Sequence, residues 1–459
     1  MIGTLIQPEI QELINSKNWS TLKEIFLDFH PTEIADILET IEENNRPILF
    51  RLLPKELAAD TFEYLNFNAQ NDLLKGLANE EVAEILNEMS PDDRTEMLEE
   101  LPGNIVKDLV KLLSPEERKI AVSLLGYPEY SIGRIMTPDF IALKTDWRID
   151  EAIEHIRKEG EEVENIEIMY ITDNNGILLD EVTIKEVLLA KPDQYVRDIM
   201  NETYITLRAE DDQEKALEIF KEYDYYMIPV VDKDNYLIGI VTADDVLDVA
   251  EEESTEDIQK FGGMEALEMP YIATPFFQMV RKRAGWLIIL FIGEMLTASA
   301  MGFFENEIAR AVVLALFVPL IISSGGNSGS QAATLTIRAM ALKEINLRDW
   351  WRVMRREVFA GLALGTVLGA IGFLRISAWT LFSDIYGPHW ILLALTVTFS
   401  LIGVVMWGTF SGSMLPFLLR KLGIDPATSS APFVATLVDV TGLIIYFSIA
   451  ALILRGTLL

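Results

Sequence analysis

The carboxy-terminal part of the chain consists of long apolar segments separated by short polar stretches. Five of these segments are long enough to cross a bilayer as helices, which takes about 20 residues. Basic residues precede the first segment and lie between the second and third and between the fourth and fifth, whereas the stretches 305–307 and 383–389 in the other two connections hold no Lys or Arg. This alternation predicts a cytoplasmic amino terminus and an outside carboxy terminus. The predicted spans are residues 286–304, 311–341, 358–381, 390–419 and 431–454.

Residues 1–130 have apolar positions three and four residues apart, a spacing typical of amphipathic helices. Ser90 and Ser114 are each followed by Pro and two acidic residues, which is a favourable helix start. The pattern predicts a stack of short helix pairs, and we expect an all-α superhelical amino-terminal domain.

A direct repeat follows. The segment that begins at Ile135 matches the segment that begins at Ile199, 64 residues later. Each copy predicts a short strand, a helix and a β-hairpin. We therefore expect an α/β pair of repeated units over residues 131–249. The predicted hairpin strands are 168–171 and 177–179 in the first copy, and 228–231 and 237–242 in the second.

Residues 250–280 connect this pair to the apolar region at 281–459 and begin with a strongly acidic helical stretch. Glu256 and Lys260 share one helical stripe, and Glu253 and Asp257 share another. Two interpretations remain for this stretch, an ordinary solvated linker or a cation-binding element.

Charge divides the chain into two unlike parts. Residues 281–459 hold 14 Lys and Arg against 9 Asp and Glu, whereas residues 1–280 hold 24 against 62, a net charge of −38. Such an acidic part argues against nucleic-acid binding, which requires basic patches. With no Cys and three scattered His, thiolate chemistry and the usual zinc ligand sets are excluded. Any bound metal would have oxygen ligands. The amino terminus lacks the features of a signal peptide, so residues 1–280 should stay in the cytoplasm.

Asp439 lies in the middle of the fifth apolar segment. A charged Asp at the centre of a spanning helix costs about 2.5–3.5 kcal/mol, so such residues usually face a water-filled pathway or a bound ion. The alternative is a structural carboxylate that hydrogen-bonds a neighbouring helix.

The second span contains Pro319, Gly325, Gly326, Asn327 and Gln331. This composition predicts a broken or loosened helix whose freed carbonyls and amide side chains could hold a hydrated cation. Close packing of helices through small residues is the alternative.

In this order of segments, the chain resembles the MgtE family of magnesium channels. The motifs that carry the resemblance are the repeated pair, which resembles tandem CBS domains, the acidic connecting helix, Gly-Gly-Asn-x-Gly-x-Gln from Gly325 and Asp-Val-Thr-Gly from Asp439. The resemblance implies a homodimer in the lipid bilayer of the cytoplasmic (inner) membrane, with one pore lined by the second and fifth spans. It implies these pore positions: Asp439, Ala435, Gly442, Asn327, Ser330 and Thr334.

The resemblance further implies that cytosolic Mg²⁺ closes the channel by bridging the soluble domains to the connecting helix. CBS pairs commonly bind adenine nucleotides, so ATP is an expected ligand. The first copy lacks the usual small residue and Asp after its last strand, which leaves nucleotide binding open. The implied regulatory positions are Asp92, Glu96, Asp245, Asp248, Glu253, Glu256 and Asp257.

Mg²⁺ prefers octahedral oxygen ligands and keeps several waters, so two Asp439 carboxylates across a symmetry axis suit a hydrated ion. The sequence leaves selectivity among Mg²⁺, Mn²⁺, Co²⁺ and Ni²⁺ open. A secondary transporter of divalent cations coupled to H⁺ or Na⁺ is an alternative. An intramembrane metalloprotease would need zinc ligands of the His-Glu-x-x-His type, which the sequence does not contain, so we do not expect an enzyme.

Overall fold

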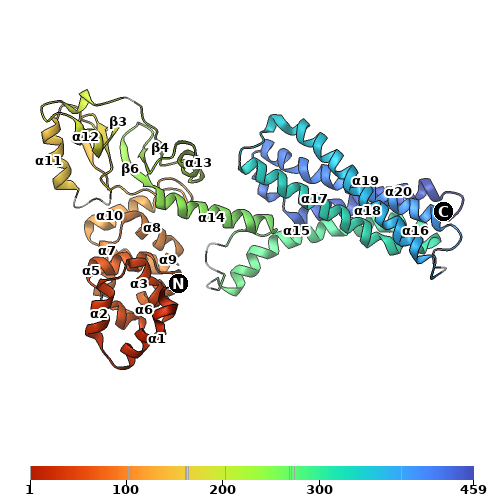
Figure 1. The fold of residues 1–459 in the computed structure, drawn as a ribbon, viewed down its shortest axis with the longest axis horizontal. Coiled ribbons are helices and arrows are strands. Elements are labelled where there is room, and N and C mark those ends of the chain that lie inside the picture. The colour runs from red at the N-terminus through yellow and green to blue at the C-terminus, as the bar shows by residue number, and fades with distance from the viewer. Residues whose placement is uncertain are drawn as a thin grey trace. The chain divides into compact units, whose positions relative to one another are not determined.

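A computed structural model describes residues 2–458 except for positions 102, 161, 162, 164, 202, 268, 270, 273 and 384. The chain folds as two compact units, Met1–Glu253 and Ser254–Leu459. Figure 1 labels the helices and strands.

Short helices follow one another along the amino-terminal part, and their apolar faces enclose one core that includes Phe26, Leu38 and Phe62. The predicted all-α domain is confirmed. The helices are α1 (Ile2–Asn15), α2 (Trp19–Leu27), α3 (Pro31–Thr40), α4 (Arg46–Phe50), α5 (Lys55–Glu63), α6 (Phe67–Gly76), α7 (Asn79–Glu88), α8 (Pro91–Glu100), α9 (Gly103–Leu109) and α10 (Pro115–Leu124).

A hydrogen bond that recurs every 24 residues fixes the stacking of these helices. Arg46, Gln70, Arg94 and Arg118 each donate to the backbone carbonyl eight residues earlier, at 2.9–3.1 Å. A buried carbonyl at a helix end has no partner within the helix, so these side chains satisfy groups that stacking would otherwise leave unpaired. The same polar contact in successive turns of the stack indicates an internal repeat of 24 residues.

A second contact has the same period. Glu39, Glu63 and Asn87 each accept a hydrogen bond from the backbone N–H 27 residues later, at 2.7–3.2 Å. Glu63 therefore has a structural function in the stack, and its carboxylate is held between α5 and the start of α8.

Two three-stranded sheets form the repeated α/β pair. In each sheet the first strand is parallel to the second and the second is antiparallel to the third. Both hairpins have a register shift at equivalent places, between Ile171 and Thr172 and between Val230 and Val231, which confirms the repeat. The elements are β1 (Ala142–Lys144), α11 (Ile149–Glu159), β2 (Ile168–Thr172), β3 (Leu178–Thr183), α12 (Ile184–Leu189) and η1 (Val196–Asp198), then β4 (Leu207–Arg208), α13 (Glu214–Tyr223), β5 (Met227–Val231), β6 (Leu237–Thr242) and α14 (Ala243–Phe261).

The first copy has Asp180 where the second copy has Gly239, and the structure explains this difference. A Cβ at Gly239 would lie 2.8 Å from the carbonyl oxygen of Thr137, so glycine lets the preceding segment approach β6. Asp180 has the equivalent place in β3, and its carboxylate accepts a hydrogen bond from the backbone N–H of Asn201 at 2.7 Å. A side chain thus replaces the backbone contact of the second copy.

The helix α14 begins directly after β6 and ends at Phe261, so it passes without a break through residues 249 and 250, where we expected a domain limit. The first spanning helix begins at Phe276, inside the expected connecting segment 250–280.

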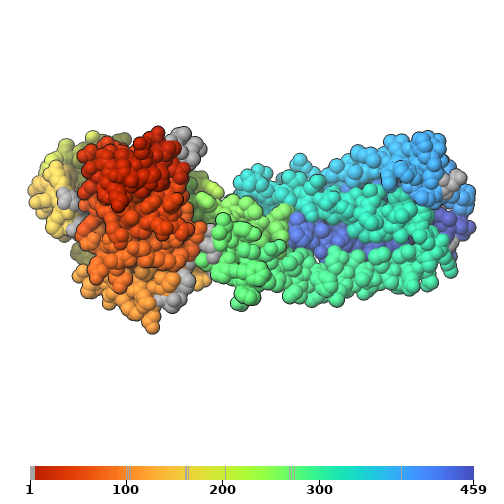
Figure 2. Space-filling model, turned by 90° about the horizontal axis from the view of Figure 1, so that it is seen from below, coloured from red at the N-terminus to blue at the C-terminus, as the bar shows by residue number. Residues whose placement is uncertain are grey.

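In the described part of the chain, five helices are long and apolar enough to cross a membrane, as predicted. The first span starts at Phe276 and the third at Leu347, both earlier than expected, because their basic residues continue the helices. In Figure 2 a blue strip of α20 surface lies between the green α15 and the turquoise helices. The elements are α15 (Phe276–Phe303), α16 (Glu305–Arg310), η2 (Val312–Phe317), α17 (Val318–Ala341), η3 (Leu347–Asp349), α18 (Trp350–Trp379), α19 (Trp390–Lys421), η4 (Pro426–Thr428) and α20 (Ala431–Leu454).

The prediction that the second span is broken at its glycines is wrong. α17 is a continuous α-helix from Val318 to Ala341, and Pro319 lies in its first turn, where proline is tolerated. The irregular backbone comes earlier, in the 3₁₀ segment η2. No carbonyls are freed at the glycines, and the alternative of close helix packing accounts for them.

The glycines of α17 bring it into direct contact with α19. A Cβ at Gly412 would lie 2.1 Å from the carbonyl oxygen of Gly329, and a Cβ at Gly408 would lie 2.3 Å from that of Gly325. Small residues let helix backbones approach in membranes, where packing rather than hydrophobic burial drives association. This crossing fixes the position of α17 in the unit.

We expect the Gly412→Ala variant to lower the free energy of unfolding by about 1–3 kcal/mol, because the added methyl group must push α17 and α19 apart. Thermal unfolding of the purified protein in detergent would measure this loss. Gly302→Ala is the matched control, since a Cβ at Gly302 of α15 meets nothing within 4 Å. An unchanged melting temperature for Gly412→Ala would contradict the packing argument.

Candidate functional site

The polar side chains of α17 gather on one face of the helix. Asn327, Ser330 and Thr334 are three and four residues apart, a spacing that places them on one stripe. Asn327 and Thr334 are exposed at the surface of the unit and Ser330 is half-buried. The Thr334 hydroxyl donates to the Ser330 carbonyl oxygen at 2.8 Å. A polar stripe of a spanning helix therefore reaches a surface that hydrocarbon could not solvate.

The helix α20 lies antiparallel beside this stripe. The Ser330 hydroxyl donates to the carbonyl oxygen of Ala431 at 3.2 Å, and a Cβ at Gly326 would lie 3.5 Å from Ala435. Asp439, one turn beyond Ala435, is half-buried. The structure thus brings the predicted positions Ala435 and Asp439 beside the polar stripe of α17.

Gly442 differs from its neighbours on the same face of α20. It is buried, and a Cβ there would lie 3.1 Å from the Val404 side chain of α19. The bundle covers the face of α20 at Gly442, whereas Ala435 and Asp439 stay partly open.

Sequence reasoning missed Glu294, a second carboxylate inside a span. It lies on α15, which packs against α20 where Gly293 approaches Thr436: a Cβ at Gly293 would lie 2.6 Å from the Thr436 methyl group. The Glu294 carboxyl group lies close enough to interact with that of Asp439. Like charges at this distance stay together only if a proton or a cation lies between them. The signal was a lone Glu in the otherwise apolar run 286–304.

In the soluble unit, two predicted acids face each other. Asp92 begins α8 and is 6% exposed, and Asp245 lies in the first turn of α14. Asp245 accepts hydrogen bonds from the backbone N–H and hydroxyl of Thr242, at 3.0 and 2.5 Å. Burial and then the charge of Asp92 raise the pKa of Asp245 well above its usual range. A cation bound between two such carboxylates would favour ionisation of both.

Further acids extend this pair, including two that sequence reasoning missed. Burial raises the pKa of Asp248 to about 6, with a contribution from Asp93. Burial and the charge of Asp93 raise the pKa of Glu63 to about 8, although a hydrogen bond from the Ser90 backbone N–H lowers it. Glu63 lies outside any recognisable motif, and only the 24-residue period places it beside Ser90.

The remaining predicted acids are more dispersed. Glu96 is exposed on α8. Glu253, at the end of the first unit, accepts a hydrogen bond from the Gln213 amide at 3.5 Å. Glu256 and Asp257 belong to the second unit, where burial and then the charge of Asp425 raise the pKa of Asp257.

The acids fit Mg²⁺ as pairs and not as a cage. Within residues 2–458, less the positions left undescribed, no three His, Cys, Asp or Glu side chains come close enough to surround an ion. Mg²⁺ usually keeps several waters and takes one or two carboxylates from the protein. The pairs Asp92–Asp245 and Asp257–Asp425 match that chemistry.

The residues that follow the last strand of each repeat copy form helix caps. Thr183 donates to Glu186 at 2.9 Å (backbone N–H) and 2.8 Å (hydroxyl), as Thr242 does to Asp245. Glu186 thus takes in the first copy the place of Asp245 in the second.

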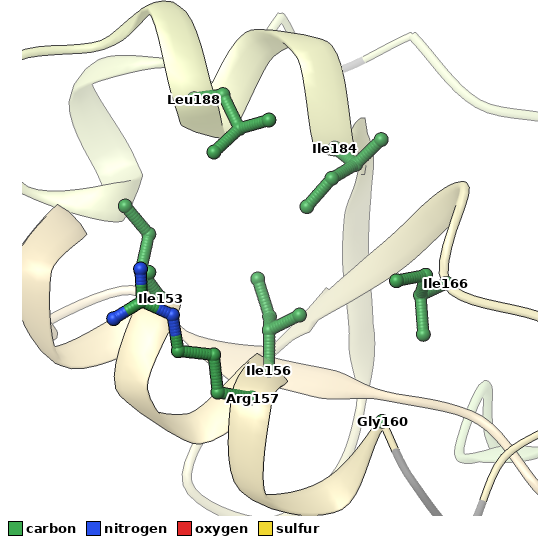
Figure 3. A pocket seen from close by; sticks show the side chains of 7 residues that line it. All are labelled: Ile153, Ile156, Arg157, Gly160, Ile166, Ile184 and Leu188. Atoms are coloured by element: carbon green, nitrogen blue, oxygen red, sulfur yellow. The ribbon is translucent and has the colours of Figure 1, made fainter.

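A surface groove lies on the first repeat, between α11 and α12. Figure 3 shows Ile184 and Leu188 of α12 across the groove from Ile156 and Arg157 of α11. The groove is mainly apolar, and none of the predicted site residues line it.

Comparison with known proteins gives matches along nearly the whole chain. A protein from Thermus thermophilus named magnesium transporter MgtE is 36% identical over 450 residues, which cover 97% of this chain and 98% of that protein. The chain belongs to the MgtE family. The MgtE protein of Enterococcus faecalis, also named a magnesium transporter, is 33% identical over 97% of this chain and 96% of that protein.

Family models match the parts of this MgtE chain in the expected order. They are the MgtE intracellular N domain at 29–130, CBS domains at 132–193 and 196–252, and the MgtE divalent cation transporter domain at 318–449. The resemblance drawn from the sequence is confirmed, and so is the expectation that the chain is not an enzyme, since its relatives are named as transporters. With five apolar helices among its described residues, this member of the family is a membrane protein whose amino-terminal part is cytosolic.

A solved structure supports the fold of the soluble part. The cytosolic domain of the Mg²⁺ channel MgtE in complex with ATP is similar to this chain, with a TM-score of 0.50 and 30% identity. The match covers 52% of this chain and 98% of that domain.

Proposed function

We propose that this chain forms a Mg²⁺-selective channel of the cytoplasmic membrane that mediates magnesium uptake and closes when Mg²⁺ binds its acidic cytosolic part. The observation that carries the proposal is the position of Asp439, inside a span and beside the polar stripe of α17. A carboxylate at that depth needs water or a cation as its partner. The names of the relatives support magnesium as the cargo.

The polar stripe favours a homodimer with the pore between the subunits. Asn327 and Thr334 are exposed on the unit, yet they belong to a spanning helix. A second copy that faces the same stripe would enclose a wet pathway and remove the polar groups from lipid. Ser330 and Thr334 would then lie toward the cytoplasm, and the carboxy terminus would lie outside.

Paired carboxylates suit an ion that keeps its water. Two copies of Asp439 would attract a divalent cation while waters fill its remaining coordination positions. Glu294 adds a negative charge beside each copy. The same chemistry admits Mn²⁺, Co²⁺ and Ni²⁺, so we propose these as further candidate ions.

Gating follows from the acids of the soluble part. Asp245 interacts with Asp92 and Asp248 with Asp93, and the raised pKa of Asp245 and of Asp248 indicates that their ionised forms are disfavoured without a cation. Bound Mg²⁺ would remove that penalty and stabilise the arrangement in which the domains approach α14, a shift of population by differential binding. Glu96, Glu253, Glu256 and Asp257 would contribute further oxygens.

ATP is the proposed nucleotide ligand of the CBS pair, because a similar cytosolic domain was crystallised with it. The chain's own CBS acids, Glu186 and Asp245, cap helices and would have to leave their Thr partners to bind a ribose hydroxyl.

A secondary transporter of divalent cations is the second candidate, and one observation favours it. Carboxyl groups as close as those of Glu294 and Asp439 can hold a proton between them, which an entering cation would release. Uptake that depends on an imposed H⁺ or Na⁺ gradient would support coupling, whereas unitary current steps would support the channel.

We expect Asp439→Ala to reduce Mg²⁺ uptake into proteoliposomes by about tenfold or more, because the pathway loses the charge that attracts the ion. Uptake would be followed with a Mg²⁺-sensitive dye inside the vesicles. Glu307→Ala removes the same charge from α16, outside the spans, and should leave uptake unchanged. Undiminished uptake by a folded Asp439→Ala protein would reject the proposed pore.

We expect the combined variant Glu253→Gln, Glu256→Gln and Asp257→Asn to stay open at Mg²⁺ concentrations that close the native channel. The affinity of such a site depends on its number of charged ligands, so the half-closing concentration should rise about tenfold or more. Patch recordings with Mg²⁺ varied on the cytoplasmic side would measure it.

The control for this variant replaces three exposed acids of α1 and α2 by glutamine: Glu9, Glu12 and Glu24. It removes equal charge from the soluble part and should close like the native protein. Closure of the Glu253, Glu256 and Asp257 variant at the native concentration would count against the gating proposal.

A further inference from the structure

The carboxy-terminal end of α14 contains a lysine whose ammonium group lies between two carboxylates. The Nζ of Lys260 is 2.6 Å from Oε1 of Glu256, one helical turn earlier, and 2.9 Å from Oδ2 of Asp425. Asp425 lies in the connection between α19 and α20, 165 residues away in the sequence. Within the second unit, the ammonium therefore joins the last turns of α14 to this connection.

Asp425 is held rigidly for this contact. Its other oxygen, Oδ1, accepts a hydrogen bond from the backbone N–H of Ala427 at 2.8 Å, which fixes the orientation of the carboxylate. Burial alone would lower the pKa of Lys260, but its hydrogen bonds to Glu256 and Asp425 raise the pKa above its ordinary value. Lys260 is thus an ammonium ion throughout the physiological pH range.

The local charge is unbalanced even with this lysine. Burial and then the charge of Asp425 raise the pKa of Asp257, and the charge of Lys260 offsets this rise only in part. The carboxylates of Glu256 and Asp425 share the single ammonium group of Lys260, and Asp257 adds a further negative charge beside them. The cluster thus attracts a further cation, and Lys260 occupies one of the places where such a cation would bind.

Other contacts hold this end of α14 in place without Lys260. Gly263, just after α14, packs on the ring of Trp286, whose indole N–H donates to the Ser430 hydroxyl at 3.1 Å. The Leu267 backbone N–H donates to the Gln259 side-chain oxygen at 2.7 Å. Gly263 has a φ of 75° and packs so closely on Trp286 that a Cβ would lie 2.7 Å from the ring. Loss of the lysine would therefore leave the helix end in position and expose the carboxylates.

We infer that Lys260 is a resident cation that competes with Mg²⁺ for Glu256, Asp257 and Asp425, and so raises the Mg²⁺ concentration at which this end of α14 binds the ion. The effect on closure rests on the proposed function. A lysine that only tied the helix to the membrane unit would act in the opposite direction, since its loss would weaken closure.

The test compares Lys260→Met with the native chain in the full-length protein. Exposed and partly exposed ion pairs are individually weak, so removal of two of them should lower the half-closing Mg²⁺ concentration by about threefold to tenfold. Lys260→Arg keeps the charge and should leave the concentration unchanged. Lys421→Met, at the end of α19, removes a basic side chain that forms none of the ion pairs found in the described part of the chain, and controls for net charge.

A second readout separates this inference from the proposed gating. The chain has no Cys, so Ile258→Cys, at a position that is 70% exposed on α14, gives a single site for an environment-sensitive dye. The Mg²⁺ midpoint of the dye signal should fall by the same factor in Lys260→Met, even if the native protein does not close with Mg²⁺ at all. A midpoint that rises or stays unchanged in Lys260→Met, or that falls equally in Lys421→Met, would overturn the inference.

Discussion

Carboxylates inside a bilayer-spanning helix bundle impose the constraint on which the account depends. Hydrocarbon offers Asp439 and Glu294 no hydrogen bonds, so water, a proton or a cation must compensate their charge. The polar stripe of α17 beside them has the same requirement. The glycines at the crossing let the continuous helix α17 pack closely against α19. The polar face of α17 therefore lies on the side that the rest of the unit does not cover.

The same electrostatic problem recurs in the soluble part, where water has access but counter-charges are scarce. Asp92 is buried and interacts with the half-buried Asp245, and burial raises the pKa of Glu63 to about 8. Such pairs are costly when ionised and become favourable when a divalent ion binds. At the end of α14, the ammonium group of Lys260 supplies a positive charge next to the carboxylates of Glu256 and Asp425. The proposed ion attraction in the spans and the proposed ion response in the cytosol thus have a common physical origin.

Much of this architecture could be predicted from periodicity and composition. The five spans, the α/β repeat and the helix starts at Ser90 and Ser114 depend on local patterns, and the structure contains them. The continuity of α17 could not be predicted, because the glycines are explained by contacts with α19 that are distant in sequence. Glu294 and Glu63 were missed for the same reason, because the role of each depends on an interaction with a residue distant in sequence.

The central claim is that the polar stripe of α17 lines a water-filled pathway, and cysteine accessibility tests it most directly. In the Cys-free chain, Thr334→Cys would be exposed to a charged, membrane-impermeant thiol reagent added from the cytoplasmic side while Mg²⁺ current is recorded. The account predicts reaction and loss of current at Thr334. It predicts no effect for Leu335→Cys, which is 67% exposed on the isolated unit but lies next to the stripe and not on it. Reaction at Leu335 together with inertness at Thr334 would contradict the account.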